Sequence, residues 1–276
     1  MRIITLMENC GSENKALLHE HGLSFYIEHK GRRFLFDCGS GNGAMQNARK
    51  LGIVLEGLDA VILSHNHYDH ATGYRDMIEG GLDCKRLYTG CGFFVRKYAA
   101  AEGGKYCDLS SGISQSFLDR HRIRHDCVST CLEIAPEVYL LSSFERTHAF
   151  EQIPERFIKE TEQGFVPDDF SDEIALAIKT VRGIVVFVGC SHPGILNMLQ
   201  TIYQRFDQKI YALFGGTHLV EADEQRISET MEIFKMLGIE LLGMNHCSGQ
   251  RAENLALTEQ AMQTCHLAVG DTLVIE

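Results

Sequence analysis

Short continuous runs of apolar residues alternate with longer amphipathic stretches along the chain, which is the pattern of strands alternating with helices. In the first half, the runs 24–29 and 33–36 are joined by Lys30-Gly31-Arg32, which predicts a hairpin. The following stretches predict a helix over 43–52, a strand over 59–64, a short helix over 72–79, a strand over 86–89 and a helix over 91–101.

The second half repeats this scheme. The apolar runs 175–181 and 184–188 predict another hairpin, and the apolar positions of 194–206 recur at helical spacing. Further on, the pattern predicts a strand over 210–214, a helix over 223–237 and a strand over 240–244. Strands with nearly continuous apolar runs need cover on both faces, so the alternation predicts an α/β fold.

Histidines gather at the end of one of these strands. The strand predicted over 59–64 runs directly into His65-Asn66-His67-Tyr68-Asp69-His70, which places four metal-ligand side chains within six residues. Three imidazoles and a carboxylate at this spacing desolvate and repel one another unless a cation holds them. A surface loop with clustered histidines is the alternative, but it does not account for the apolar strand that precedes the run. We therefore predict a metal site here.

The spacing within this run indicates more than one ion. In an extended segment, residues i and i+2 point the same way, so His65 and His67 can hold one ion while Asp69 and His70 reach a second position. Imidazole and carboxylate ligands suit zinc, iron or manganese, and a run without Cys argues against a closed structural zinc site. We expect one or two divalent metal ions as cofactors, with zinc first and iron or manganese as alternatives.

Three later histidines have the same context. His192, His218 and His246 each follow within a few residues of a predicted strand. Ligands placed beyond strand ends can converge on one edge, where open α/β sheets put their binding sites.

At these residues the chain resembles a known superfamily. The run Ser64-His65-Asn66-His67-Tyr68-Asp69-His70 is the signature of the metallo-β-lactamase fold, and Phe34-Leu35-Phe36-Asp37-Cys38-Gly39 resembles its early strand ending in Asp-x-Gly. Further resemblances are carried by Gly189-Cys190-Ser191-His192-Pro193-Gly194, by Gly215-Gly216-Thr217-His218-Leu219 and by Asn245-His246-Cys247-Ser248-Gly249. Together these segments resemble one branch, often named after a 7,8-dihydropterin-6-methyl-4-(β-D-ribofuranosyl)aminobenzene-5'-phosphate synthase, whose members are mostly called metal-dependent hydrolases.

The resemblance implies a four-layer αββα sandwich of the metallo-β-lactamase type. It implies a single domain over residues 1–276, with a variable lid or pocket segment at about 91–170. It also implies a binuclear centre in which the first ion is held by His65, His67 and His192 and the second by Asp69, His70 and His246.

The chain departs from the superfamily pattern at His218, where a bridging Asp is usual. A histidine can bind one ion but bridges two poorly, so His218 is either a terminal ligand or an outer or substrate-binding residue, and a single bound ion stays an alternative. Asp37 is expected to accept a hydrogen bond from the metal-binding run, with an ordinary turn residue as the alternative. Asp172 and Glu173 are expected to be solvated acids at a strand start, with reach to the site as the alternative.

Substrate specificity is expected from the segment 91–170, because long connections beside a site form lids or pocket walls. The candidates for contacts with an anionic substrate are Arg96, Lys97 and Arg146. A solvated basic helix face is the alternative for each.

Composition narrows the class of partner. A net charge of −11 disfavours general affinity for nucleic acid phosphates. Glu8 comes too early for a signal peptide, and no stretch approaches the roughly 18 apolar residues of a membrane span. We therefore expect a cytoplasmic protein that acts on a small, anionic molecule.

The ten cysteines have irregular spacing and contain no Cys-x-x-Cys pair. In a reducing cytosol they are expected to be free thiols. A separate zinc cluster is the alternative for the cysteines of the middle region, which are Cys84, Cys91, Cys107, Cys127 and Cys131.

Three functions compete. The first is a metal-dependent hydrolase that uses a metal-activated water, with Asp69 as the catalytic residue and a phosphodiester or other phosphorylated small molecule as substrate. The second, suggested by the branch, is a transferase or synthase that condenses a pterin with a ribofuranosylaminobenzene phosphate. The third, suggested by the cysteines, is a non-enzymatic metal-binding or redox-responsive module.

Overall fold

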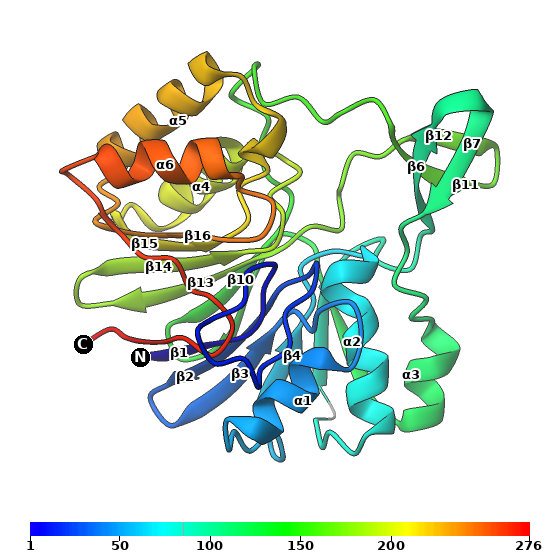
Figure 1. Cartoon of the computed structure of the whole chain (residues 1–276). Helices are drawn as coiled ribbons and strands as arrows, with labels where there is room; N and C mark the ends of the chain where they lie inside the picture. Colours follow the sequence, from blue (N-terminus) through cyan, green and yellow to red (C-terminus); the bar gives the residue numbers. More distant parts are fainter. Residues whose placement is uncertain (85) are drawn as a thin grey trace. The chain divides into compact units, whose positions relative to one another are not determined.

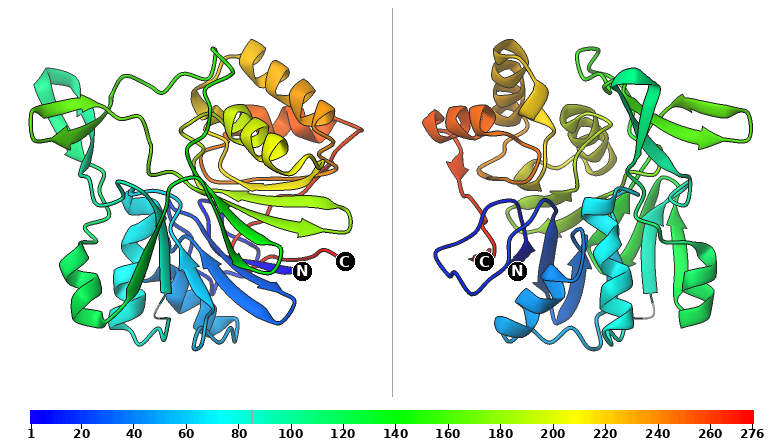
Figure 2. Two further views of the ribbon diagram at one scale, coloured as in Figure 1. Left: turned by 180° about the vertical axis from the view of Figure 1, so that it is seen from behind. Right: turned by 45° about the vertical axis from the view of Figure 1, so that its right-hand side comes forward.

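The structure, a computed structural model, describes residues 1–84 and 86–276. These residues form two compact units whose segments alternate along the chain. Unit 1 comprises Met1–Cys127, Ile153–Asp172 and Leu267–Glu276, and unit 2 comprises Val128–Gln152 and Glu173–His266. Each unit has a seven-stranded sheet and helices of its own (Figures 1 and 2).

The large sheet of unit 1 has the strand order β18-β1-β2-β3-β4-β5-β8. The predicted hairpin is confirmed, since β2 and β3 pair antiparallel from Phe25↔Phe36 to His29↔Arg32. β4 and β5 then join in parallel, as strands connected by helices do. The strands are β1 (Arg2–Met7), β2 (Ser24–His29), β3 (Arg32–Phe36), β4 (Ala60–Ile62), β5 (Arg86–Gly90), β8 (Arg124–Val128) and β18 (Thr272–Val274).

Three helices of unit 1 share one apolar core with this sheet. They are α1 (Gly43–Lys50), α2 (Tyr68–Glu79) and α3 (Gln115–His121). Ala48, Tyr74 and Leu118, one from each helix, are fully buried in the same cluster as Leu35 of β3 and Val61 of β4. Helices and sheet therefore form the two-layer half that the expected αββα sandwich requires.

A smaller sheet of unit 1 has the order β12-β11-β6-β7. Its strands are β6 (Lys97–Ala101), β7 (Lys105–Asp108), β11 (Phe157–Thr161) and β12 (Gly164–Pro167), with the 3-10 turn η1 (Glu102–Gly104) between β6 and β7. The helix predicted over 91–101 is therefore wrong. Alanines 99–101 favour a helix by propensity, but pairing with β7 and with the distant β11 overrides that preference.

Unit 2 is built in the same way around the sheet β17-β16-β15-β14-β13-β10-β9. The second predicted hairpin is confirmed, with β13 and β14 paired from Leu176↔Phe187 to Thr180↔Gly183. β15, β16 and β17 follow in parallel. The strands are β9 (Cys131–Ala135), β10 (Val138–Leu141), β13 (Ala175–Thr180), β14 (Gly183–Val188), β15 (Ile210–Gly215), β16 (Leu241–Met244) and β17 (Gln263–Thr264).

The helices of unit 2 also pack into a single core. They are α4 (Ile195–Phe206), α5 (Glu224–Met236) and α6 (Gln250–Thr258), with the 3-10 turn η2 (Leu219–Glu221) after β15. The periodic residues Ile195, Leu199 and Ile202 of α4 are fully buried against Val186 and Leu213 of the sheet. The α/β fold class predicted from the alternating pattern is confirmed.

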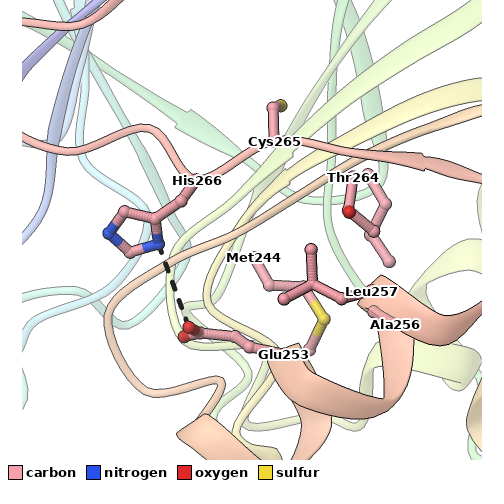
Figure 3. A pocket seen from close by; sticks show the side chains of 8 residues that line it. Met244, Glu253, Ala256, Leu257, Thr264, Cys265 and His266 are labelled. Atoms are coloured by element: carbon pink, nitrogen blue, oxygen red, sulfur yellow. Dashed lines mark ion pairs between the residues drawn. The ribbon is translucent and has the colours of Figure 1, made fainter.

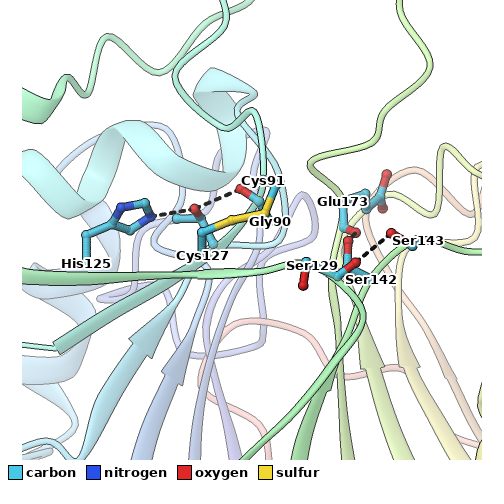
Figure 4. The surroundings of a disulfide bond; sticks show 9 residues. Gly90, Cys91, His125, Cys127, Ser129, Ser142, Ser143 and Glu173 are labelled. Carbon is cyan, nitrogen blue, oxygen red and sulfur yellow. Dashed lines mark hydrogen bonds between the residues drawn. A yellow bond between two sulfur atoms is a disulfide. The ribbon is translucent and has the colours of Figure 1, made fainter.

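A disulfide joins Cys91 to Cys127 within unit 1 (Figure 4). It connects the ends of β5 and β8, which are neighbours in the large sheet, beside His125 Nε2 and its 2.8 Å contact to Thr89 Oγ1. The expectation of free thiols is wrong for this pair, because strands 36 residues apart in sequence bring the two sulfurs together. Of the other middle-region cysteines, Cys84 is buried, Cys131 is half-buried and Cys107 is exposed.

Among residues 1–84 and 86–276, none of the helices has the length and hydropathy that crossing a bilayer requires.

Candidate metal centre

The predicted metal-binding run lies where β4 gives way to α2. His67 precedes the first helical residue, so α2 begins at Tyr68, four residues earlier than the sequence pattern predicts. Asp69 falls in the first turn, where the helix dipole favours a carboxylate. Asp69 and His70 therefore lie on the first turn of α2, whereas His65 and His67 precede the helix.

The three imidazoles of the run are buried and crowded. The ring centroids of His65 and His67 lie 4.6 Å apart, and those of His65 and His70 lie 4.4 Å apart. Burial lowers the pKa of His65 well below its ordinary value, and the neighbouring His70 and His67 lower it further. A neutral imidazole at this position keeps a nitrogen lone pair, which is the form that binds metal.

One buried carboxylate sets the orientation of two of these rings. Asp37 Oδ2 lies 2.7 Å from His70 Nδ1 and accepts a hydrogen bond of 2.8 Å from Ser64 Oγ. Since the hydroxyl proton of Ser64 points to Asp37, its oxygen is left to accept from His65 Nδ1, 2.9 Å away. Both histidines are thereby held with Nδ1 as the donor, which makes Nε2 the nitrogen of each ring that can bind metal. Asp37 thus does for the metal-binding run what its position after β3 suggested.

Asp37→Asn is expected to weaken metal binding about 10- to 100-fold. Oδ1 of Asp37 accepts from the Ser64 amide and Oδ2 accepts from Ser64 Oγ and His70 Nδ1, so the NH2 group of an asparagine would face one of these donors. Asn tolerates the left-handed backbone of residue 37 (φ 57°), so the fold should persist. Metal affinity is measured by competition with a chromophoric chelator. Asp59→Asn is the control, since Asp59 accepts from the Arg33 amide far from any of these imidazoles; equal losses in both variants contradict the assignment.

Asp69 has a neighbour that sequence reasoning missed. His21 Nε2 lies 3.0 Å from Asp69 Oδ2, and His70 Nε2 lies 3.8 Å from the same oxygen. The Asp69 carbonyl accepts from the Leu23 amide, which fixes the start of α2 to the segment before β2. His21 sits in a polar stretch without periodicity, so nothing in the sequence marks it as part of the site.

A buried cluster of Lys97, Asp168 and Asp172 contacts the metal-binding run at Asn66. Asp172 Oδ2 accepts a hydrogen bond of 2.9 Å from the Asn66 amide, between the two histidines. The Lys97 ammonium lies 2.5 Å from Asp168 Oδ2 and 2.8 Å from Asp172 Oδ1, and 4.3 Å above the ring of Phe170. Burial lowers the pKa of Lys97, but Asp172 and Asp168 outweigh it and raise the pKa above its usual value.

Lys97 was predicted as a substrate-binding cation, and that prediction is wrong. Its side chain is only 3% exposed and is neutralised by two carboxylates, so it is not available to an anionic substrate. Asp172 was expected to be solvated but is buried, because it accepts from Asn66 and pairs with Lys97. Arg96 is exposed and pairs with Asp108 at 2.5 Å on the small sheet.

The histidines of unit 2 gather around a cysteine. The rings of His192 and His218 have centroids 4.6 Å apart. Cys190 Sγ lies within 4.8 Å of a ring nitrogen of His192 and of a ring nitrogen of His246. All except the half-buried His218 are buried. Unit 2 therefore collects three predicted histidines, together with a thiol that sequence reasoning did not count as a ligand.

Glu173 holds the loop that carries His192. Its two carboxylate oxygens accept from the amides of Ser191, at 2.6 Å, and His192, at 3.0 Å. Glu173 is fully buried, so the expectation that it is a solvated acid is wrong. These two bonds fix the loop at Ser191, whose backbone is left-handed (φ 62°). The burial of Glu173 depends on the backbone donors of Ser191 and His192, which lie 18 and 19 residues further along the chain.

The start of α4 is stabilised by a buried acid as well. Glu151 accepts from the amides of Leu196 and Asn197, and burial raises its pKa. Gly194 must be a glycine, since its φ is +98° and an added Cβ would lie 2.2 Å from Glu151 Oε2. Arg146, predicted to bind substrate, is exposed and donates from Nη1 to the carbonyl of Pro193, next to His192.

The donor sets of both units suit a divalent metal. In unit 1, buried imidazoles and the Asp69 carboxylate lie together, with Nδ1 of two rings already engaged. In unit 2, imidazoles lie beside a thiol. Neutral nitrogens with one anionic oxygen or sulfur match the preferences of zinc and iron.

A pocket of unit 2 is lined by side chains other than the predicted metal ligands (Figure 3). Met244, Ala256 and Leu257 line it, with the Glu253–His266 ion pair (3.9 Å) at its edge. Its volume of about 50 Å³ is well below the roughly 300–1,000 Å³ of small-molecule sites. It is therefore not a substrate site.

Sequence comparison identifies known proteins that are similar to this chain. The sequence profile of the metallo-beta-lactamase superfamily matches residues 19–79. A 7,8-dihydropterin-6-methyl-4-(beta-D-ribofuranosyl)-aminobenzene-5'-phosphate synthase of Methanocaldococcus jannaschii is 30% identical over 268 residues, covering 94% of this chain and 91% of that protein.

Solved structures with a similar fold are found as well. Tm1679, described as a metal-dependent hydrolase of the beta-lactamase superfamily, is 29% identical with a TM-score of 0.86, covering 100% of this chain and 99% of that one. A diphosphatase from the PhnP family shares the fold at 12% identity, with a TM-score of 0.55 and coverage of 100% and 98%.

Proposed function

The chain belongs to the metallo-beta-lactamase superfamily, in the branch of the dihydropterin-linked synthase, and we propose that it is a metal-dependent hydrolase of phosphodiesters or other phosphorylated small molecules. The observation that carries the proposal is the Asp37–Ser64–His65 and Asp37–His70 arrangement, which holds two buried imidazoles with Nδ1 as the donor, so that Nε2 is the nitrogen that can bind metal. A buried carboxylate that orients histidines in this way is typical of a metal site.

In this proposal, one ion is held by His65, His67 and His192, and a second by Asp69, His70 and His246. When bound, such ions polarise a substrate oxygen and lower the pKa of water from about 15.7 towards about 7. His218, beside His192, serves as a further ligand or contacts the substrate.

The protein's own groups then orient the reaction. Asp69 positions the attacking water through its carboxylate, and His21, 3.0 Å from that carboxylate, holds it in place. Arg146 is exposed beside the His192 loop and offers a guanidinium to a phosphoryl group. The name of the Methanocaldococcus relative includes a ribofuranosyl 5'-phosphate, which supports a phosphorylated substrate.

The alternative is a transferase. The relative that is 30% identical is named as a synthase, and the same donor set can stabilise an anion without hydrolysis. In this case the chain joins a pterin to a ribofuranosylaminobenzene phosphate, and water must be kept from the reacting centre.

A substrate panel separates these functions. The zinc-, iron- and manganese-loaded proteins are assayed with phosphate mono- and diesters, lactones and thioesters, and in parallel with a pterin pyrophosphate plus the arylamine phosphate. We expect metal-dependent release of alcohol from a phosphodiester and no coupled product. Formation of the coupled product with an inactive hydrolysis panel supports the synthase instead.

A further inference from the structure

Cys190 lies close enough to two of the predicted histidine ligands to bind the same metal ion. Its Sγ is within 4.8 Å of ring nitrogens of both His192 and His246, and all three side chains are at most 8% exposed. Two ligand atoms on one tetrahedral zinc, with Zn–S of about 2.3 Å and Zn–N of about 2.1 Å, are roughly 3.6 Å apart. The thiol is thus within the range from which small side-chain rotations bring it onto a shared ion.

The other buried free thiols have different surroundings. Cys38 and Cys84 lie in the apolar core of unit 1, and burial raises the pKa of each. Such thiols are structural and inert. Cys190 instead lies beside two imidazoles at the end of β14, where the sequence resemblance places a metal-binding segment.

The backbone around Cys190 is fixed on both sides. The preceding Gly189 carbonyl accepts from the Gly216 amide at 2.9 Å, and the following Ser191 amide donates to Glu173. Ser191 Oγ donates to the Gly216 carbonyl at 2.7 Å. The thiol of Cys247 donates to the Cys190 carbonyl at 3.6 Å. These bonds hold the Cys190 loop against the turn that carries His218, so the backbone that carries the sulfur is fixed by the fold.

We propose that Cys190 binds the metal centre as a thiolate and bridges the ions held by His192 and His246, a role that rests on the function proposed above. The superfamily pattern places a bridging carboxylate near His218, where this chain has no acid until Glu221. A thiolate supplies the same single negative charge and can contact two ions.

This ligand also narrows the choice of metal. A soft thiolate favours zinc or iron, whereas manganese prefers oxygen ligands. A site with a sulfur bridge is therefore expected to bind zinc in preference to manganese.

Cobalt(II) substitution tests the proposal without an activity assay. The protein is stripped of metal, loaded with cobalt(II), and examined for bound cobalt and for the sulfur-to-cobalt charge-transfer band in the near ultraviolet. We expect the band in the wild-type protein and its loss in Cys190→Ser and Cys190→Ala. Metal affinity should fall at least about tenfold, since even outer hydrogen-bond partners contribute 10- to 100-fold. Cys247→Ala, which removes the neighbouring sulfur, should keep the band.

The outcomes separate this proposal from the proposed function. Cobalt bound without a charge-transfer band, or a band that persists in both Cys190 variants, overturns the thiolate ligand while the metal site stands. A band that vanishes in Cys247→Ala and persists in Cys190→Ala also overturns it. No bound cobalt in the wild-type protein overturns both.

Discussion

Replacement of Asp69 by alanine is expected to lower metal-dependent turnover at least about 100-fold, the lower end of what a positioned acid–base group contributes. Asp69 is buried in the first turn of α2, between His21 and His70, and is the only carboxylate of the metal-binding run. In the proposed function, the second ion then loses one of its ligands and the attacking water loses the carboxylate that positions it. Turnover is measured as kcat/KM with the best phosphodiester of the panel, at saturating metal.

Asp69→Asn separates charge from shape, and the matched control is Asp76→Asn, two turns later on α2 and half-buried. The asparagine at 69 should be nearly as inactive as the alanine, because it keeps the side-chain size but loses the charge. Asp76→Asn should retain full turnover. Undiminished turnover in Asp69→Ala rejects the catalytic assignment.

Replacement of Lys97 by methionine is expected to destabilise the protein by about 3–5 kcal/mol, because it leaves two buried carboxylates without their cation. Asp172 and Asp168 then repel each other. A displaced Asp172 no longer accepts from the Asn66 amide within the metal-binding run, so metal affinity should fall too. Denaturant unfolding of the metal-free protein measures the first effect, and metal titration the second.

The small sheet offers a matched control for this change. Lys159 pairs with the exposed Asp169 at 2.6 Å and stands opposite Lys97 in the β6–β11 ladder. Lys159→Met should cost at most about 1 kcal/mol, as exposed ion pairs do. Equal losses in the two variants show that the Lys97 cluster does not contribute as described.

Local patterns were sufficient for much of the fold. Both hairpins depend on short apolar runs around Lys30-Gly31-Arg32 and Arg182-Gly183, whose turn residues lie within the segment that they predict. The helix predicted over 223–237 begins where expected because Asp223 accepts from the Arg226 amide as its cap. Such features are visible in sequence, since partner and element are neighbours along the chain.

Features that depend on distant partners were missed. Strand β6 was predicted as a helix because its alanines favour a helix, and its partner β11 lies far along the chain. Asp172 and Glu173 were assigned to solvent, and Lys97 to a substrate, because charged side chains are usually exposed. Their burial depends on partners that only the fold brings close. The Cys91–Cys127 disulfide belongs to the same class.

The residues of the candidate site also form two groups, those that a local pattern indicates and those that only the fold brings together. The metal-binding run was recognisable because His65, His67, Asp69 and His70 fall within six residues at a strand end. Asp37 was recognisable through its position after β3. Cys190 and His21 carry no such signal. Cysteines are often buried as small apolar residues, and His21 belongs to the site only through its contact with Asp69.

The central claim, that the buried histidines of both units bind divalent metal, is tested most directly by anomalous scattering from crystals at the zinc and iron absorption edges. We expect one or two peaks, with the first about 2.0–2.1 Å from nitrogens of His65, His67 and His192. Peaks confined to the cysteines of the middle region, or no peak near these imidazoles in metal-loaded protein, contradict it.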